Sequence, residues 1–142
     1  MNSTDDTKKA GSPDNAPPQL PVVMIVDDSP VQTNIFRRLA KGIAATFIIV
    51  ESWEKALNAI ENQKLDIVIT DYNLDDGRTG VDLVKCLQSA GQTSRCFFMT
   101  TESPTGIRQE LGDYKAAGFL VKPVNFKKFK LFMEKQISVL SH

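Results

Sequence analysis

Five short apolar segments alternate along the chain with longer segments of helical periodicity. Each apolar segment is four or five residues long, is apolar without a regular alternation, and is bounded by turn-forming residues. This pattern is typical of strands that are covered on both faces, as in a parallel sheet with helices on each side. The predicted strands are residues 22–26, 46–50, 66–70, 96–100 and 118–121.

The segments between the predicted strands space their apolar residues along one face of a helix. Val31, Ile35 and Leu39 form such a stripe, and Asn125 is a candidate N-cap for a final helix that counts Phe126 among its core residues. Strands and helices in alternation predict an α/β fold, a doubly wound five-stranded parallel sheet with helices on both faces. Helices are expected over residues 31–42, 53–62, 81–90, 107–117 and from about 125 onward.

Composition changes near residue 21. Residues 1–21 are rich in proline and polar residues and hold one large aliphatic residue, Leu20, so we expect a disordered N-terminal leader. Residues 22–140 carry the periodic pattern and are expected to form one folded domain, which leaves no room in this chain for an output domain.

The charge balance and the apolar runs exclude several classes of function. Seventeen basic residues balance seventeen acidic ones, whereas binding to nucleic acid usually requires a basic excess. No apolar run approaches the roughly 20 residues that cross a bilayer, and no signal peptide precedes the body. We therefore expect a cytoplasmic protein without nucleic-acid or membrane partners. Cys86 and Cys96 have no metal-binding or redox spacing and are expected to be reduced packing residues.

Polar side chains follow four of the five predicted strands. Asp27 and Asp28 follow the first, Asp71 the third, and Lys122 the fifth, while Thr100 ends the fourth. In doubly wound sheets the carboxyl ends of the strands form the ligand-binding edge. Crowded carboxylates favour a hard divalent cation, and Mg²⁺ fits oxygen ligands and phosphate. A carboxylate can also act as a nucleophile toward a phosphoryl group, with lysine and hydroxyl groups binding its oxygens.

These motifs together resemble a known family. The Asp27-Asp28 pair, Asp71 in ITDYNL, Thr100 in FFMTT and the Lys122-Pro123 dipeptide look like the receiver domain of two-component response regulators over about residues 22–140. The resemblance implies a flavodoxin-like sheet with strand order 2-1-3-4-5 and a cis Lys122-Pro123 bond.

The resemblance also implies a chemistry. Asp71 would accept a phosphoryl group from a phosphohistidine of a histidine kinase or a histidine phosphotransfer protein. Mg²⁺ would be held by Asp28, Asp71 and the backbone carbonyl of Asn73, with Asp27 acting largely through water. The chain would be a phosphoacceptor rather than a turnover enzyme.

Signalling would follow from the same resemblance. Thr100 and Lys122 would bind the phosphoryl group, and Phe119 matches the aromatic switch residue that changes rotamer when Thr100 moves inward. Output would then come from an unidentified protein partner, bound on the face of the fourth helix, fifth strand and fifth helix, or from onward transfer of the phosphoryl group.

Three features depart from the family pattern. Thr101 stands where a small residue is common, and its side chain could narrow access to the phosphoacceptor. The loop YNLDDGRTG lacks the usual proline and is one residue longer before Gly80, which leaves room for mobility and altered metal affinity. Phe119 lacks the hydroxyl of the tyrosine that is often present.

Other interpretations of the same residues remain open. Asp27 and Asp28 could cap the first helix, and Asp71 could be a turn residue. At the level of function, one alternative is a pseudo-receiver that docks partners without regulated phosphorylation. An aspartyl-nucleophile phosphatase of the haloacid dehalogenase type is disfavoured, because Asn73 stands where a second Asp would act as general acid.

Overall fold

The computed structural model describes residues 19–101 and 105–140 of the 142-residue chain, so most of the expected leader lies outside the described residues. Within these ranges, no helix combines the length and the apolar character needed to cross a bilayer. The strands are β2 (Val22–Val26), β3 (Thr46–Val50), β4 (Ile67–Asp71), β5 (Arg95–Thr100) and β6 (Gly118–Val121). The helices are α2 (Pro30–Leu39), α3 (Trp53–Asn62), α4 (Gly80–Ser89), α5 (Thr105–Leu111) and α6 (Phe126–Leu140), with a 3-10 turn η2 (Asp75–Gly77).

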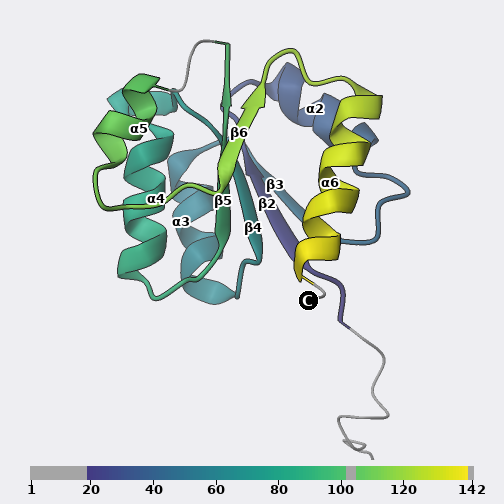
Figure 1. Cartoon of the computed structure of the whole chain (residues 1–142), viewed down its shortest axis with the longest axis horizontal. Coiled ribbons are helices and arrows are strands. Elements are labelled where there is room, and N and C mark those ends of the chain that lie inside the picture. Colours follow the sequence, from purple (N-terminus) through teal and green to yellow (C-terminus); the bar gives the residue numbers. More distant parts are fainter. Residues whose placement is uncertain (1–18, 102–104, 141–142) are drawn as a thin grey trace, which may run out of the picture.

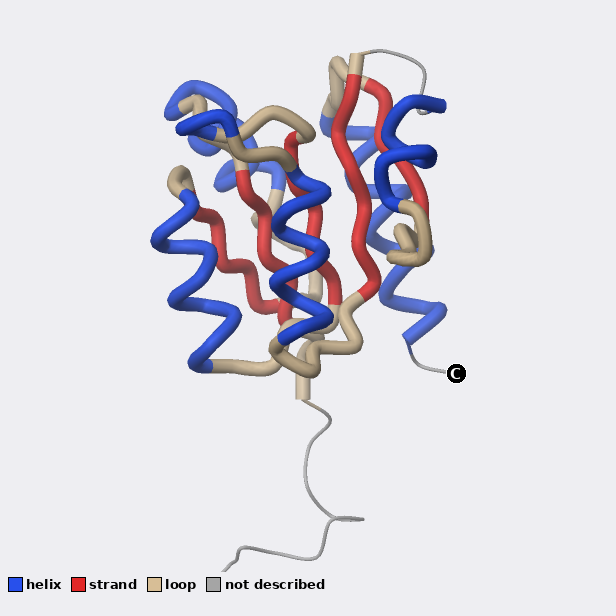
Figure 2. Tube along the Cα trace, turned by 90° about the vertical axis from the view of Figure 1, so that its left-hand side faces the viewer, coloured by secondary structure: helices blue, strands red, loops and turns tan. Residues whose placement is uncertain are grey.

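All five strands of the sheet pair in parallel, in the order β3-β2-β4-β5-β6. Counted along the chain this is the order 2-1-3-4-5, which confirms the doubly wound sheet. The carboxyl ends of the strands therefore lie at one edge, and the amino ends at the opposite edge, where the chain enters β2 (Figures 1 and 2).

Helices cover both faces of the sheet (Figure 1). On one face, α2 and α6 pack over Ile25, Ile69 and Phe97 in one apolar cluster, and Phe129 of α6 lies fully buried there. On the other face, α3, α4 and α5 pack over residues such as Val68 in a second cluster. Each strand thus contributes side chains to two cores, which explains why the strand sequences are continuously apolar.

Helix starts are fixed by side chains that accept backbone hydrogen bonds. Ser29 caps α2, and Thr79 caps α4 in a reciprocal pair with Asp82, whose carboxylate accepts from the Thr79 amide at 2.9 Å. Asn125 accepts from the Lys128 amide at 2.8 Å, as expected for the start of α6. Because Ser29 caps α2, the interpretation of Asp27 and Asp28 as simple helix caps is not needed.

Four predictions for the helices need correction. Val31 is 68% exposed, since it lies about 140° around the helix axis from the buried Phe36. Helix α2 ends at Leu39 rather than residue 42, and α5 ends at Leu111 rather than residue 117, where Gly112 takes a left-handed conformation with φ +57°. Phe126 is 53% exposed, because it occupies the first turn of α6, outside the face that buries Phe129.

Both cysteines are free thiols. Cys96 on β5 is buried, and burial raises the pKa of its thiol to about 12. Cys86 on α4 is half-buried. Neither thiol approaches the carboxyl edge of the sheet, so they act as packing residues.

Gly80 allows α4 to start directly against the sheet. A Cβ atom at this position would lie 2.7 Å from Cε1 of Phe98 and 2.9 Å from the backbone oxygen of Asp71. The Gly80 amide donates a 2.6 Å hydrogen bond to the backbone oxygen of Tyr72. The absence of a side chain at residue 80 therefore sets the distance between α4 and the end of β4.

We predict that Gly80→Ala lowers the free energy of unfolding by about 1 to 3 kcal/mol, because the methyl group must displace Phe98 or the backbone at Asp71. Urea denaturation followed by circular dichroism measures the change. Gly106→Ala is the matched control, since no atom lies within 4 Å of the added Cβ, and it should leave stability unchanged or slightly raised. A Gly80→Ala variant as stable as the control would contradict this account of the close approach.

Candidate functional site: an acidic cluster with a lysine at the carboxyl edge

The strand register brings the expected polar residues to one edge of the sheet. Val26 at the end of β2 pairs with Thr70 of β4, so Asp27 and Asp71 extend the two strands side by side. Thr100, the last residue of β5, pairs with Val121 of β6, and the Lys122 amide donates a 2.9 Å hydrogen bond to the Thr100 carbonyl. Residues far apart in sequence thus become neighbours through parallel pairing alone.

Three carboxylates gather at this edge. Oxygen atoms of Asp27, Asp28 and Asp71 all lie within 4.8 Å of one another. Their environments differ: Asp27 is buried, Asp71 is half-buried and Asp28 is exposed. The cluster therefore extends from a buried carboxylate to one that is exposed to solvent.

Lys122 supplies the opposite charge. Its Nζ lies 3.2 Å from Oδ1 of Asp71 and 3.9 Å from Oδ2 of Asp27. The lysine side chain is only 25% exposed, so these two ion pairs are less screened by solvent than pairs at an open surface. One ammonium thus offsets part of the charge of two neighbouring carboxylates.

Asp27 carries a buried oxygen that lacks a hydrogen bond. Its Oδ1 accepts from the Ser29 amide at 3.0 Å, whereas Oδ2 is buried without a hydrogen-bond donor within the described part of the chain. The pKa of the Asp27 carboxyl is raised, mainly because burial penalises the charged form, with a further contribution from the negative charge of Asp71. An unsatisfied carboxylate oxygen inside an acidic cluster fits a cation, and three oxygen donors suit Mg²⁺.

A pocket of about 450 Å³ opens beside Asp71. Lys122 and Thr100 line it, and so do Asn73 and Thr101, from the loops after β4 and β5. Thr101, which stands where a small residue is common in the family, is exposed and lies at the rim of the pocket. Sequence reasoning missed four further lining residues, Tyr72, Met99, Gly106 and Ile107.

The loop after Asp71 is anchored at several points. Leu74 is buried, and its amide donates a 2.8 Å hydrogen bond to the Arg78 carbonyl. The Arg78 guanidinium lies 4.8 Å from the ring centroid of Trp53 on α3, in a cation-π contact. Asp76 takes a left-handed conformation with φ 58° in the η2 turn. The η2 turn thus lies at the outer part of this loop, and Asn73 remains beside the pocket.

Phe119 lies on the α5 side of the sheet, half-buried. Its ring stacks on Phe98 with centroids 5.9 Å apart, and the Arg108 guanidinium covers it at 4.6 Å. Val121 of β6 pairs with Thr100 of β5, and Phe119 lies two residues before Val121 on the same strand. The Phe119 ring thus lies between the sheet and helix α5. The Lys122-Pro123 bond is cis, as expected.

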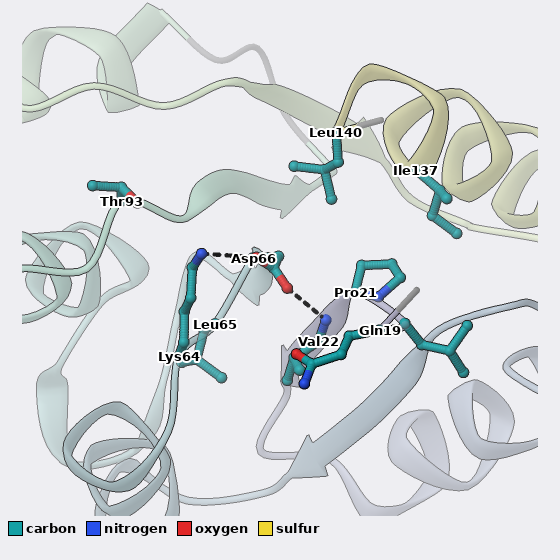
Figure 3. Close-up of a pocket in the computed structure, with 10 residues that line it drawn as sticks. Gln19, Pro21, Val22, Lys64, Leu65, Asp66, Thr93, Ile137 and Leu140 are labelled. Carbon is teal, nitrogen blue, oxygen red and sulfur yellow. Dashed lines mark hydrogen bonds and ion pairs between the residues drawn. The ribbon is translucent and has the colours of Figure 1, made fainter. Parts of the chain in front are cut away.

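A larger pocket of about 550 Å³ lies at the opposite edge, near the start of β2 (Figure 3). Its lining mixes aliphatic residues such as Leu20 and Leu140 with polar residues such as Gln19 and Thr93. The charged groups there are engaged, since Asp66 accepts from the Val22 amide at 2.8 Å and lies 4.0 Å from Lys64. This pocket lacks the convergent carboxylates of the other edge.

The molecule is thus a doubly wound α/β protein with an acidic carboxyl edge. A sequence model described as the response regulator receiver domain matches residues 23–133, and the chain belongs to this family. The two-component response regulator ORR3 of Oryza sativa subsp. indica is 33% identical in an alignment that covers 73% of this chain and 81% of that protein. The two-component response regulator ARR6 of Arabidopsis thaliana is 26% identical in an alignment that covers 98% of this chain and 78% of that protein.

Solved structures have the same fold. The chemotaxis response regulator CheY4 of Vibrio cholerae superposes with a TM-score of 0.72 at 26% identity, covering 83% of this chain and 99% of that one. The receiver domain of sensor histidine kinase PA1611 from Pseudomonas aeruginosa gives a TM-score of 0.69 at 16% identity, covering 85% of this chain and 99% of that one. That structure was solved with a magnesium ion coordinated in its active-site cleft. The flavodoxin-like fold expected from the sequence is confirmed.

We predict that Asp27→Asn raises the free energy of unfolding at neutral pH in metal-free buffer. The pKa of Asp27 is raised in the folded state, so this carboxyl lowers the stability of the fold as pH rises above its ordinary pKa of 3.8. Asparagine cannot ionise and keeps an oxygen for the Ser29 amide. The advantage should shrink as pH falls toward 3.8.

Urea denaturation at neutral and acidic pH, with chelator present, measures the difference. Asp28→Asn is the matched control, because Asp28 is the exposed carboxylate of the same cluster. An Asp27→Asn variant that is less stable than wild type at neutral pH would contradict the assignment of a desolvated charge.

Proposed function

We propose that this receiver domain accepts a phosphoryl group on Asp71 from a phosphohistidine of a histidine kinase or of a histidine phosphotransfer protein. The observation that carries the proposal is the placement of Lys122 3.2 Å from Asp71 inside a pocket that also presents Thr100. Receiver domains are phosphoacceptors rather than turnover enzymes, and two-component signalling supplies a phosphodonor of this kind.

The chemistry follows from the groups at the edge. An oxygen of Asp71 attacks phosphorus as the bond from phosphorus to the donor imidazole breaks, so the electron pair of that bond leaves with the histidine. Lys122 pairs with a phosphoryl oxygen, and Thr100 binds another. Such transfer depends mainly on position and on neutralising charge, because the transition state spreads negative charge over the phosphoryl oxygens.

Mg²⁺ would complete this neutralisation. Asp28, Asp71 and the backbone carbonyl of Asn73 would hold the ion, with Asp27 acting largely through water. The unsatisfied Oδ2 of Asp27 and the short separations among the three carboxylates support this assignment. The ion would offset the repulsion between the acidic edge and the incoming phosphoryl group.

The signal would pass through Thr100 and Phe119. When Thr100 is drawn toward a phosphoryl group, Phe119 would change rotamer and alter the face formed by α5, β6 and α6. Val121 and Phe126 are exposed apolar residues on this face, suited to an unidentified protein partner. We propose output by altered binding or by onward transfer of the phosphoryl group. The match to ORR3, which covers 81% of that protein, supports this proposal. The cytoplasmic location expected from the sequence belongs to the same proposal.

The pseudo-receiver alternative is not favoured. The acidic groups, the lysine and the strand-end threonine that phosphorylation requires are all present at the edge. A docking module without phosphorylation would not need this arrangement.

We predict that acetyl phosphate with Mg²⁺ adds one phosphoryl mass to the protein, and that Asp71→Asn abolishes the addition. Intact-mass spectrometry measures it, and hydroxylamine treatment should remove the adduct because an acyl phosphate is labile to this nucleophile. Asp75→Asn, in the nearby η2 turn, is the matched control and should be labelled like wild type. Labelling that persists in Asp71→Asn, or no labelling of wild type, would refute the proposal.

We also predict that Mg²⁺ stabilises the unphosphorylated protein, because it binds the folded acidic cluster and not the unfolded chain. The gain is about 2.7 kcal/mol once Mg²⁺ reaches 100 times its Kd. Thermal or urea unfolding with and without Mg²⁺ measures it. Asp28→Asn should lose most of the gain, whereas Asp113→Asn, on the loop after α5, should keep it. An equal gain in both variants would indicate binding elsewhere.

A further inference from the structure

Tyr72 and helix α5 form two walls of the phosphoacceptor pocket. Tyr72 follows Asp71 directly in the chain, and Gly106 and Ile107 of α5 line the same pocket. The hydroxyl of Tyr72 donates a hydrogen bond to Oε1 of Glu110 on α5. A single side-chain contact therefore joins the residue next to the phosphoacceptor to the helix on the other side of the pocket.

Tyr72 is the fixed partner in this contact. Its amide donates to the Met99 carbonyl at 3.3 Å, and its carbonyl accepts from the Gly80 amide at 2.6 Å. Its ring packs against the apolar cluster beneath α3, α4 and α5. The backbone of Tyr72 is thus held from β5 and from α4, so loss of the side-chain contact would release Glu110 rather than Tyr72.

Helix α5 is the weakly held partner. It has seven residues, fewer than an isolated helix needs for stability in water. Ile107 and Leu111 are its buried residues, and it ends at the left-handed Gly112. Two polar contacts at its surface, Glu110 to Tyr72 and Arg108 over Phe119, add to these apolar contacts in holding its position.

The Tyr72 hydroxyl is suited to a lasting contact. A hydrogen bond from a neutral hydroxyl to a carboxylate is stronger than one between neutral groups.

We infer that the Tyr72–Glu110 hydrogen bond holds α5 against one side of the pocket and thereby lengthens the life of the phosphoryl group on Asp71. This inference rests on the proposed phosphorylation. In the reaction that ends the signal, a water oxygen bonds to phosphorus as the bond to the Asp71 oxygen breaks. Inorganic phosphate leaves, the carboxylate is restored and the proton of the water passes to solvent. Holding α5 in place restricts the approach of that water, so Tyr72 and Glu110 are positioning residues.

The test compares phosphoryl lifetimes in the full chain. Protein is labelled with acetyl phosphate and Mg²⁺, the donor is removed, and loss of the phosphoryl mass is followed. Tyr72→Phe and Glu110→Ala should each lose it about threefold to tenfold faster than wild type, as expected for loss of one hydrogen bond. The double variant should be no faster than the faster single variant, because both changes remove the same contact.

Conservative and matched variants separate this role from general destabilisation. Glu110→Gln keeps an acceptor oxygen and should restore most of the wild-type lifetime. Gln109→Ala on α5 and Tyr114→Phe beyond it should leave the lifetime unchanged. Hydrogen exchange of the α5 amides in unphosphorylated protein should be faster in Tyr72→Phe and Glu110→Ala, but not in Glu110→Gln.

Each outcome decides the inference. Labelling that depends on Asp71, together with unchanged lifetimes in Tyr72→Phe and Glu110→Ala, would overturn the inference and leave the proposed function standing. It would also be overturned if the increases in the rate of phosphoryl loss multiplied in the double variant, or if hydrogen exchange of the α5 amides were unchanged in the single variants. If wild type takes up no phosphoryl group, the proposed function fails and the inference fails with it.

Discussion

The ammonium of Lys122 lies 3.2 Å from Asp71 and 3.9 Å from Asp27, and the carboxyl edge depends on this interaction. Without it, the buried Asp27 carboxylate would face Asp71 with no ion pair from the described part of the chain. The lysine is itself held in place, since its amide bonds to the Thr100 carbonyl. Parallel pairing of β5 and β6 thus sets the position of the ammonium that offsets the repulsion between the carboxylates. The cost of burying Asp27 remains visible in its raised pKa, which is typical of a site built for binding rather than for stability.

The sequence was sufficient to predict the sheet and the edge at which the polar residues meet. Strands that are apolar on both faces must be covered by helices, and parallel strands carry their carboxyl ends to the same side. Asp71, Thr100 and Lys122 could therefore be placed together from chain order, before any contact was known. Their individual roles came from a resemblance and remain proposals.

What the sequence could not predict depends on contacts between distant segments. Val31 fits an apolar stripe by spacing, yet it faces solvent because the stripe is set by Phe36 and its neighbours. Gly80 stands in the sequence only as the residue that ends the loop after Asp71, whereas its role follows from the position of the Phe98 ring. The bond from Tyr72 to Glu110 joins residues 38 positions apart and has no local signature. Such contacts follow from packing in three dimensions rather than from periodicity.

The hydrogen bond from the Gly80 amide to the Tyr72 carbonyl has a consequence for the loop between them. The chain leaves the sheet at Tyr72 and returns to within one hydrogen bond of the same point, so residues 73–79 form a closed excursion. The entropy cost of closing such an excursion grows only slowly with its length. Insertions and substitutions at the outer part of this excursion, in the η2 turn Asp75–Gly77, can alter the surface there while Asp71 and α4 keep their places. This turn is therefore a part of the surface that can vary in sequence without disturbing the acidic edge.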